Sequence, residues 1–170
     1  LIIDDRMNGG GNVSPMIIER LQREVYRMNM YRNGSEGLAT IPESTHHGPK
    51  VCLVDKYSSS DGDLFPYGFQ KLGIGPLIGT RTWGGIVGIS GSKPYVDGQD
   101  VRTPFFTSYS TDGKWILENE GVTPDIYVDI NPFEDYLGND AQLNKAVEVL
   151  LEQIKTYPQL PGVPAPRVMD

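Results

Sequence analysis

The sequence is poor in residues that form covalent cross-links or bind metals. It contains one cysteine, Cys52, and two histidines, His46 and His47. A single thiol excludes an internal disulfide and a zinc site built on cysteines. Two adjacent histidines with no spaced carboxylate make only a weak metal pattern. We therefore expect neither a metal nor another cofactor.

Long apolar runs and an excess of positive charge are also lacking. No apolar run approaches the roughly 20 residues that span a bilayer, which argues against a membrane-spanning segment. The 170 residues include 22 acidic and 15 basic side chains, so the net charge is −7. This balance argues against nucleic acid as a partner, because phosphate binding requires a basic surface.

The sequence has neither an initial methionine nor a targeting segment. It opens on the apolar residues Leu1-Ile2-Ile3, and no signal or transit peptide pattern is found. We expect from this opening that the chain was cut from a longer polypeptide, whose upstream part would carry any export signal.

The residues that are present predict an α/β fold with a mostly parallel sheet and a strand-rich insertion. A content of 38% hydrophobic and 22% charged residues can form a core, which excludes global disorder. The 20 glycines and 13 prolines predict many turns. Apolar runs and segments of helical period then alternate along the chain. The expected strands are 1–4, 51–55, 76–80, 86–89, 101–106 and 115–117. The expected helices are 14–30, 64–72 and 140–154, and Ser14 and Asp140 are expected to be the N-caps of the first and the last.

Two stretches are predicted to lack regular structure. Residues 31–49 have no clear period and read as a long loop, which in a compact domain is usually functional or mobile. Residues 158–170 form a proline-rich C-terminal tail. The folded domain is therefore expected to cover residues 1–157.

The first strand leads into a glycine-rich turn, Asn8-Gly9-Gly10-Gly11. Consecutive glycines let backbone N–H groups approach a ligand, because no Cβ is in the way. Such a turn suits a phosphate or a developing oxyanion, and it also occurs as a plain tight turn. The sequence has neither the GxGxxG nor the GK[ST] pattern of nucleotide-binding loops.

A serine cluster, Ser58-Ser59-Ser60, lies between the buried strand at 51–55 and the next helix. A serine at a helix N-terminus is exposed to the positive end of the helix dipole, which favours developing negative charge. This is how a serine nucleophile is placed, although the GxSxG pattern is absent. Serine clusters before helices also serve as simple caps.

Taken together, the motifs resemble the S41 family of serine peptidases, the C-terminal processing peptidases, and most closely their tricorn-like branch. The resemblance extends from Leu1 to about Ile154. The motifs occur in family order and are Asp4-x-Arg6-x-Asn8-x-Gly10-Gly11, 58–63 (SSSDGD), 79–85 (GTRTWGG), 96–98 (VDG), 118–125 (ENEGVTPD), and 138–140 (GND) with Leu143.

The resemblance implies a ClpP/crotonase-like core of strand–strand–helix units and a peptidase that works through an acyl-enzyme. It implies that Ser60 is the nucleophile. It further implies an oxyanion hole formed by the backbone N–H of Asp61 and by one from Gly10 or Gly11. Which of the two glycines supplies this donor stays open.

The resemblance also bears on the catalytic base. C-terminal processing peptidases use a lysine where this sequence has Gly85, and a glycine cannot deprotonate a serine. The tricorn-like branch uses a histidine supported by a serine and a glutamate, and Glu118 matches that glutamate. In that branch the histidine precedes the region present here, so His46 and His47 are expected to be loop residues.

Several further residues are expected to be structural. Arg6 and Asp125 are motif positions suited to a charge pair or to turn capping. Cys52, in an apolar run, is expected to be inert. Four aromatic residues are expected to belong to the core: Phe65, Tyr67, Phe69 and Trp83.

The resemblance implies peptide or unfolded-protein substrates and homo-oligomers of the full-length protein. It does not fix the compartment, since tricorn-like proteins occur in the cytosol and some bacterial relatives carry export signals. Glu36 is a candidate for an acidic residue that would favour basic substrate side chains. Two alternatives stay open: a non-catalytic peptide-binding or assembly module of the same fold, and a phosphate-binding domain that uses the Gly9–Gly11 turn.

Overall fold

A four-stranded parallel sheet lies at the centre of the structure, which is a computed structural model that describes residues 1–32, 38–91 and 94–165. The strand order is β1-β4-β5-β8, and each neighbouring pair is parallel. The strands are β1 (Ile2–Asp4), β4 (Val51–Val54), β5 (Leu77–Gly79) and β8 (Ile126–Tyr127). The predicted α/β class with a mostly parallel sheet is confirmed.

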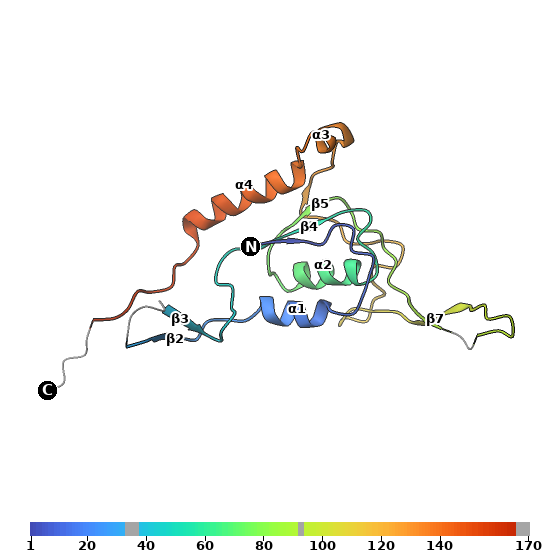
Figure 1. Cartoon of the computed structure of the whole chain (residues 1–170), viewed down its shortest axis with the longest axis horizontal. Helices are drawn as coiled ribbons and strands as arrows, with labels where there is room; N and C mark the ends of the chain where they lie inside the picture. Colours follow the sequence, from blue (N-terminus) through green and yellow to red (C-terminus); the bar gives the residue numbers. More distant parts are fainter. Residues whose placement is uncertain (33–37, 92–93, 166–170) are drawn as a thin grey trace.

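Helices cover both faces of this sheet (Figure 1). The helices α1 (Ser14–Leu21) and α2 (Asp61–Lys71) lie on one face, and α4 (Ala141–Thr156) lies on the other. The β4 side chains alternate between two clusters, with Cys52 and Val54 toward α1 and α2, and Val51 and Leu53 toward α4. All four are buried, as expected for a central parallel strand with a continuous apolar run.

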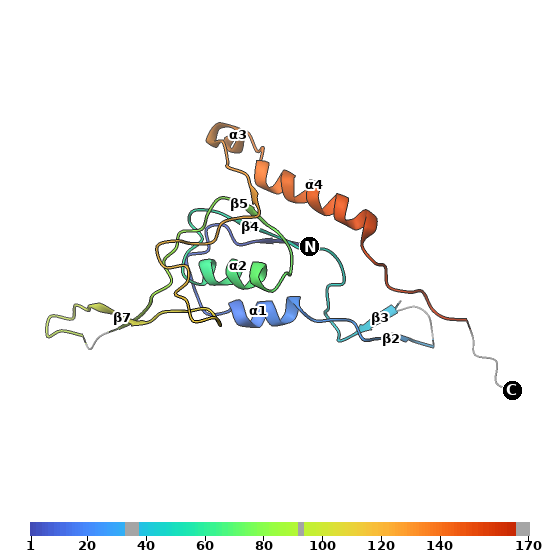
Figure 2. The same cartoon turned by 180° about the vertical axis from the view of Figure 1, so that it is seen from behind.

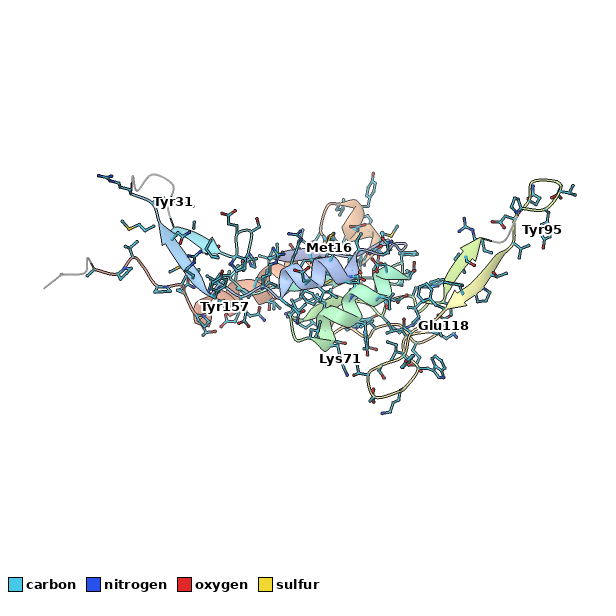
Figure 3. All side chains as sticks on the ribbon, turned by 90° about the horizontal axis from the view of Figure 1, so that it is seen from below. Met16, Tyr31, Lys71, Tyr95, Glu118 and Tyr157 are labelled. Atoms are coloured by element: carbon cyan, nitrogen blue, oxygen red, sulfur yellow. The ribbon has the colours of Figure 1, made fainter. Side chains whose placement is uncertain are left out.

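Two antiparallel hairpins project from opposite ends of this body, as Figures 1 and 2 show. One is formed by β2 (Arg27–Met30) and β3 (Leu38–Ile41), and the other by β6 (Gly88–Gly91) and β7 (Arg102–Phe106). In Figure 3, Tyr31 lies beyond the first hairpin and Tyr95 at the tip of the second. A short helix, α3 (Pro132–Tyr136), lies before α4.

The first helix is shorter than its sequence pattern predicts. It ends at Leu21 instead of near Met30, and Arg27–Met30 forms β2. The reason is a tertiary partner: this segment pairs with Leu38–Ile41, inside the stretch expected to be a loop. The strand predicted at 115–117 is also absent, and only an isolated bridge joins Tyr109 to Trp115.

The two predicted helix caps have different outcomes. Asp140 caps α4, and its carboxylate accepts a 2.9 Å hydrogen bond from the Leu143 N–H, as expected. Ser14 is not the cap of α1, because it is already the first helical residue. The N-terminus of α1 is bound instead by the carboxylate of Asp61, a contact that connects this helix to the candidate site.

Candidate active site

Ser60 lies where the turn after β4 enters α2, with a backbone conformation unusual for a residue that has a side chain. Its φ is 57° and its ψ is −113°. The Ser60 N–H donates to the Gly85 carbonyl at 3.1 Å and to Oδ2 of Asp63 at 3.0 Å. Strained residues at a strand-to-helix turn are frequent at catalytic nucleophiles, where the surroundings hold the strain.

The glycine turn lies directly against Ser60. A Cβ placed on Gly10 would be 3.0 Å from the Ser60 Cβ and 3.2 Å from its Oγ, and Gly10 has a φ of +125°. The Asn8 carbonyl accepts a 2.8 Å hydrogen bond from the Ser59 N–H. The glycine turn and the serine cluster are therefore adjacent, and a side chain at Gly10 would crowd Ser60 and strain the backbone.

Asp61 joins the glycine turn to the Ser60 turn through its side chain. Its Oδ2 accepts from the Val13 N–H at 2.9 Å and from the Ser14 N–H at 3.1 Å, and its Oδ1 accepts from the Ser14 hydroxyl. Its own backbone N–H is the first of α2, and such N–H groups have no partner within the helix. Asp61 thus holds the N-terminus of α1 with its side chain and begins α2 with its backbone.

Asp63 organises the other side of the turn, a role that the motif alone did not indicate. Its carboxylate is fully buried and accepts hydrogen bonds from Ser60, Gly84 and Gly85, as well as from the Thr82 hydroxyl. The sequence carried one usable signal: an acidic residue three positions after a serine N-cap is typical of a capping box.

Glu118 is held in a tight turn at the base of the β6–β7 hairpin (Figure 3). Its Oε2 accepts from the Ile86 N–H at 2.7 Å and from the Val87 N–H at 3.0 Å. Those residues follow Gly85, whose carbonyl accepts the Ser60 N–H. A short run of backbone therefore connects Glu118 to the Ser60 turn, and the Glu118 carboxylate accepts hydrogen bonds from main-chain N–H groups.

The two histidines lie at the far end of β4. They precede the N-terminal end of this strand, whereas Ser60 follows its C-terminal end. Nε2 of His47 is 2.9 Å from the Pro158 carbonyl, and its ring packs edge-on against Tyr157, beyond α4. Partial burial lowers the pKa of His46. Both imidazoles therefore lie at the opposite edge of the sheet from the Ser60 turn.

A buried carboxylate at Asp5 lies beneath the glycine turn, and no sequence pattern predicted it. Asp5 is 6% exposed, and its Oδ1 accepts a 2.8 Å hydrogen bond from the Asn8 amide. Its Oδ2 has no hydrogen-bond partner in the described part of the chain. Burial raises the pKa of Asp5 to about 7, against the opposing effect of the Asn8 hydrogen bond.

Arg6 forms the charge pairs expected of it, and Asp125 binds the backbone at the start of a strand. Arg6 pairs with Asp4 at 2.7 Å and with Asp140 at 2.8 Å, which ties the end of β1 to the start of α4. Asp125 accepts from the Leu77 N–H at 2.7 Å, at the start of β5.

The expectations for Cys52 and the aromatic residues have mixed outcomes. Cys52 is buried, and burial raises the pKa of its thiol. Phe65 and Phe69 are buried core residues and Tyr67 is partly buried against them, but Trp83 is 62% exposed, so its placement in the core was wrong. The Trp83 ring lies over Gly85, where a Cβ would be 2.3 Å from it.

A cavity of about 560 Å³ lies at the C-terminal edge of the sheet, and its lining includes several acidic residues, Arg6 and Lys56, but not Ser60. Within the described ranges, no group of three or more His, Cys, Asp or Glu side chains could hold a metal ion. In the same ranges, no helix is long and apolar enough to cross a bilayer. Glu36, the candidate for substrate preference, lies outside the described residues.

The parallel sheet, the strained serine and the glycine turn define an α/β protein with a candidate serine nucleophile, and comparison with known proteins gives its family. The family model "Peptidase family S41" matches residues 1–128. Tricorn protease from Thermoplasma acidophilum is 38% identical over 166 residues, and the tricorn protease homolog of Saccharolobus solfataricus is 40% identical over 157 residues. These matches cover 97% and 91% of this chain.

A solved structure agrees with the sequence matches. The crystal structure of the tricorn protease superposes with a TM-score of 0.86, at 38% identity over 92% of this chain. The chain belongs to peptidase family S41. It spans 15% of the Thermoplasma relative and 14% of the Saccharolobus relative.

Proposed function

We propose that this chain is the nucleophile-bearing part of a tricorn-like serine peptidase. The observation that carries the proposal is the close approach of Gly10 to Ser60: a strained serine at a helix N-terminus faces Gly10, where a Cβ would lie 3.0 Å from the Ser60 Cβ. The two relatives that are 38% and 40% identical over most of this chain are named tricorn protease and tricorn protease homolog. The residues 1–157 would form the C-terminal part of the catalytic domain.

In the proposed reaction, the Oγ of Ser60 attacks the carbonyl carbon of a peptide bond. A C–O bond forms while the hydroxyl proton passes to a histidine, which we expect from polypeptide outside this chain. The C–N bond then breaks, and the leaving amine takes that proton. Water hydrolyses the resulting ester and releases the second product. Glu118 would stabilise the protonated histidine through an intervening hydroxyl.

The oxyanion of the tetrahedral intermediate would accept hydrogen bonds from the Asp61 N–H and from the glycine turn. The Gly10 N–H already donates to the Asn8 Oδ1 at 3.0 Å. Among the hydrogen bonds of the described ranges, none is donated by the Gly11 N–H. We therefore assign the second donor to Gly11, with Gly10 as the close-packed residue beside Ser60.

Labelling with a fluorophosphonate tests this assignment. We expect the 170-residue chain to react slowly at Ser60, because both of its histidines lie at the other end of β4. Added imidazole should accelerate the reaction by supplying the missing base. Ser60→Ala should abolish labelling, and Ser59→Ala should leave its rate within about twofold of wild type.

Three results would contradict the proposal. Labelling at another serine would show that Ser60 is not the nucleophile, and fast labelling without imidazole would show that the base lies within this chain. No labelling at Ser60 even with imidazole would favour a non-catalytic peptide-binding module that has kept the fold.

A further inference from the structure

Asp63 is a buried carboxylate that the peptidase reaction leaves without a role. It lies in the first turn of α2, three residues after Ser60, and is fully buried. No salt bridge of the described residues includes it. All of its hydrogen-bond partners are neutral donors, so oriented N–H and O–H dipoles stabilise the carboxylate.

The two oxygens of Asp63 bind two segments that are separate in sequence. Oδ2 accepts from the Ser60 N–H and from the Gly85 N–H, each at 3.0 Å. Oδ1 accepts from the Gly84 N–H at 2.8 Å and from the Thr82 hydroxyl. One side chain therefore fixes the nucleophile turn and residues 82–85 relative to each other.

These contacts close a small ring of hydrogen bonds around the strained residue. The Ser60 N–H is shared between Asp63 and the Gly85 carbonyl, while the Gly85 N–H returns to the same Asp63 oxygen. A φ of 57° at Ser60 is costly for a residue with a Cβ and persists only where its surroundings hold it. Hydrogen bonds to a carboxylate are strong enough to do so.

The ring also extends to the glutamate. The backbone that leaves Gly85 enters Ile86 and Val87, which donate to Glu118. The Thr82 hydroxyl, besides donating to Asp63, accepts a 2.7 Å hydrogen bond from the Val122 N–H, just after the Glu118 turn. Both routes from Asp63 thus lead to the segment that holds Glu118.

We propose that Asp63 is the positioning residue of this site: it holds the backbone of Ser60 in its strained conformation and sets the distance between Ser60 and Glu118. The structural part of this proposal concerns the backbone alone. Its effect on reactivity rests on the proposed function, so the two parts need separate measurements.

Amide hydrogen exchange tests the structural part. Asp63→Asn keeps the side-chain shape but turns an NH₂ group toward one pair of donors, so two of the four contacts are lost. We expect exchange at Ser60 and Gly85, or at Gly84, to become at least about tenfold faster. Thr82→Val removes the hydroxyl donor and keeps the Asp63 carboxylate, so exchange at these amides should also become faster. Thr82→Ser keeps the hydroxyl, so exchange should stay at the wild-type rate.

Asp125→Asn is the matched control. It also removes a carboxylate that accepts a backbone N–H, from Leu77, but at the start of β5. It should change exchange at Leu77 and leave Ser60, Gly84 and Gly85 as in wild type. Wild-type exchange at these three amides in both Asp63→Asn and Thr82→Val would overturn the proposal.

The labelling rate of Ser60 in the presence of imidazole tests the effect on reactivity. At a temperature where the variants are folded, we expect Asp63→Asn to label at least about tenfold more slowly. Thr82→Ser and Asp125→Asn should label at the wild-type rate. Equal rates for Asp63→Asn and wild type would overturn the effect on reactivity. If wild type itself fails to label, the proposed function fails, and the exchange data still decide whether Asp63 holds this backbone.

Discussion

At the residue scale, Gly10 and Gly9 are a natural pair for testing the glycine turn. A Cβ on Gly10 would contact Ser60 at 3.0 Å and would require a φ of +125°, whereas a Cβ on Gly9 would meet no atom within 4 Å. We expect Gly10→Ala to slow Ser60 labelling by at least about tenfold, because Ser60 must shift by a few tenths of an ångström and the backbone of residue 10 becomes strained.

Gly9→Ala serves as the control for this substitution. It adds the same methyl group one residue earlier, and we expect labelling within about twofold of wild type. Fluorophosphonate labelling in the presence of imidazole measures both variants. Equal rates for Gly10→Ala and wild type would show that the turn does not shape the space around Ser60.

Single residues also show what the sequence could and could not predict. The glycine turn and the serine cluster could be predicted from the sequence, because each is a local pattern between a strand and a helix. The partners of Asp5 and Asp63 were not visible, because they depend on which turns meet across the fold. The prediction that Trp83 lies in the core was wrong, because the burial of an aromatic ring depends on which other segments pack over it. In this structure the Trp83 ring lies over Gly85 at the surface.

At the element scale, Asp61 stabilises α1 from outside that helix. Its carboxylate replaces the missing N-cap side chain, since the N-cap residue Val13 has none that can accept a hydrogen bond. We expect Asp61→Ala to lower the free energy of unfolding by about 1–3 kcal/mol and Ser14→Ala by about 1 kcal/mol, measured in urea.

A double-mutant cycle shows whether these two side chains act together. Because the Ser14 hydroxyl donates to Asp61, the double variant should lose at least about 0.5 kcal/mol less than the two single losses combined. Asp140→Ala, which uncaps α4, should be additive with Ser14→Ala. Additivity between Asp61 and Ser14 would show that their contact contributes no stability.

The elements themselves were predictable where the local pattern and the tertiary partner agree. The continuous apolar run of β4 and the Asp140 cap of α4 needed no other information. The end of α1 did not follow its pattern, because residues 27–30 gain a β partner from residues 38–41. The short β8 has only two residues and no periodic signal, and its position is set by pairing with β5.

At the scale of the whole molecule, Ser60 and the two histidines lie at opposite edges of the sheet. Ser60, the glycine turn and Asp63 gather after the C-terminal ends of β1 and β4, and the two histidines lie at the opposite edge. The chain spans about one seventh of the tricorn relatives, at 15% of the Thermoplasma protein. Because both histidines lie at the opposite edge of the sheet from Ser60, we propose that the base comes from polypeptide outside the chain.

The stability of the whole molecule should depend on the ionisation of Asp5. Its pKa rises from the ordinary value of 3.8 to about 7 in the folded chain, because burial disfavours the charged form and because the nearby carboxylates of Asp61, Asp4 and Asp55 repel it. Between these two pH values the folded state therefore binds a proton that the unfolded state has released. Stability contributed by this group is fully present below pH 3.8 and is lost as the pH rises to about 7.

Asp5→Asn should remove this loss. The amide oxygen can still accept from Asn8, and the NH₂ group takes the place of the oxygen that has no partner. Since one pKa unit corresponds to about 1.4 kcal/mol, we expect the variant to exceed wild type at pH 8 by at most about 4 kcal/mol in free energy of unfolding. The two should converge near pH 4, as measured by urea unfolding across this range. Asp97→Asn makes the same charge change on an exposed turn, so an equal gain there would assign the effect to net charge instead of to the buried Asp5.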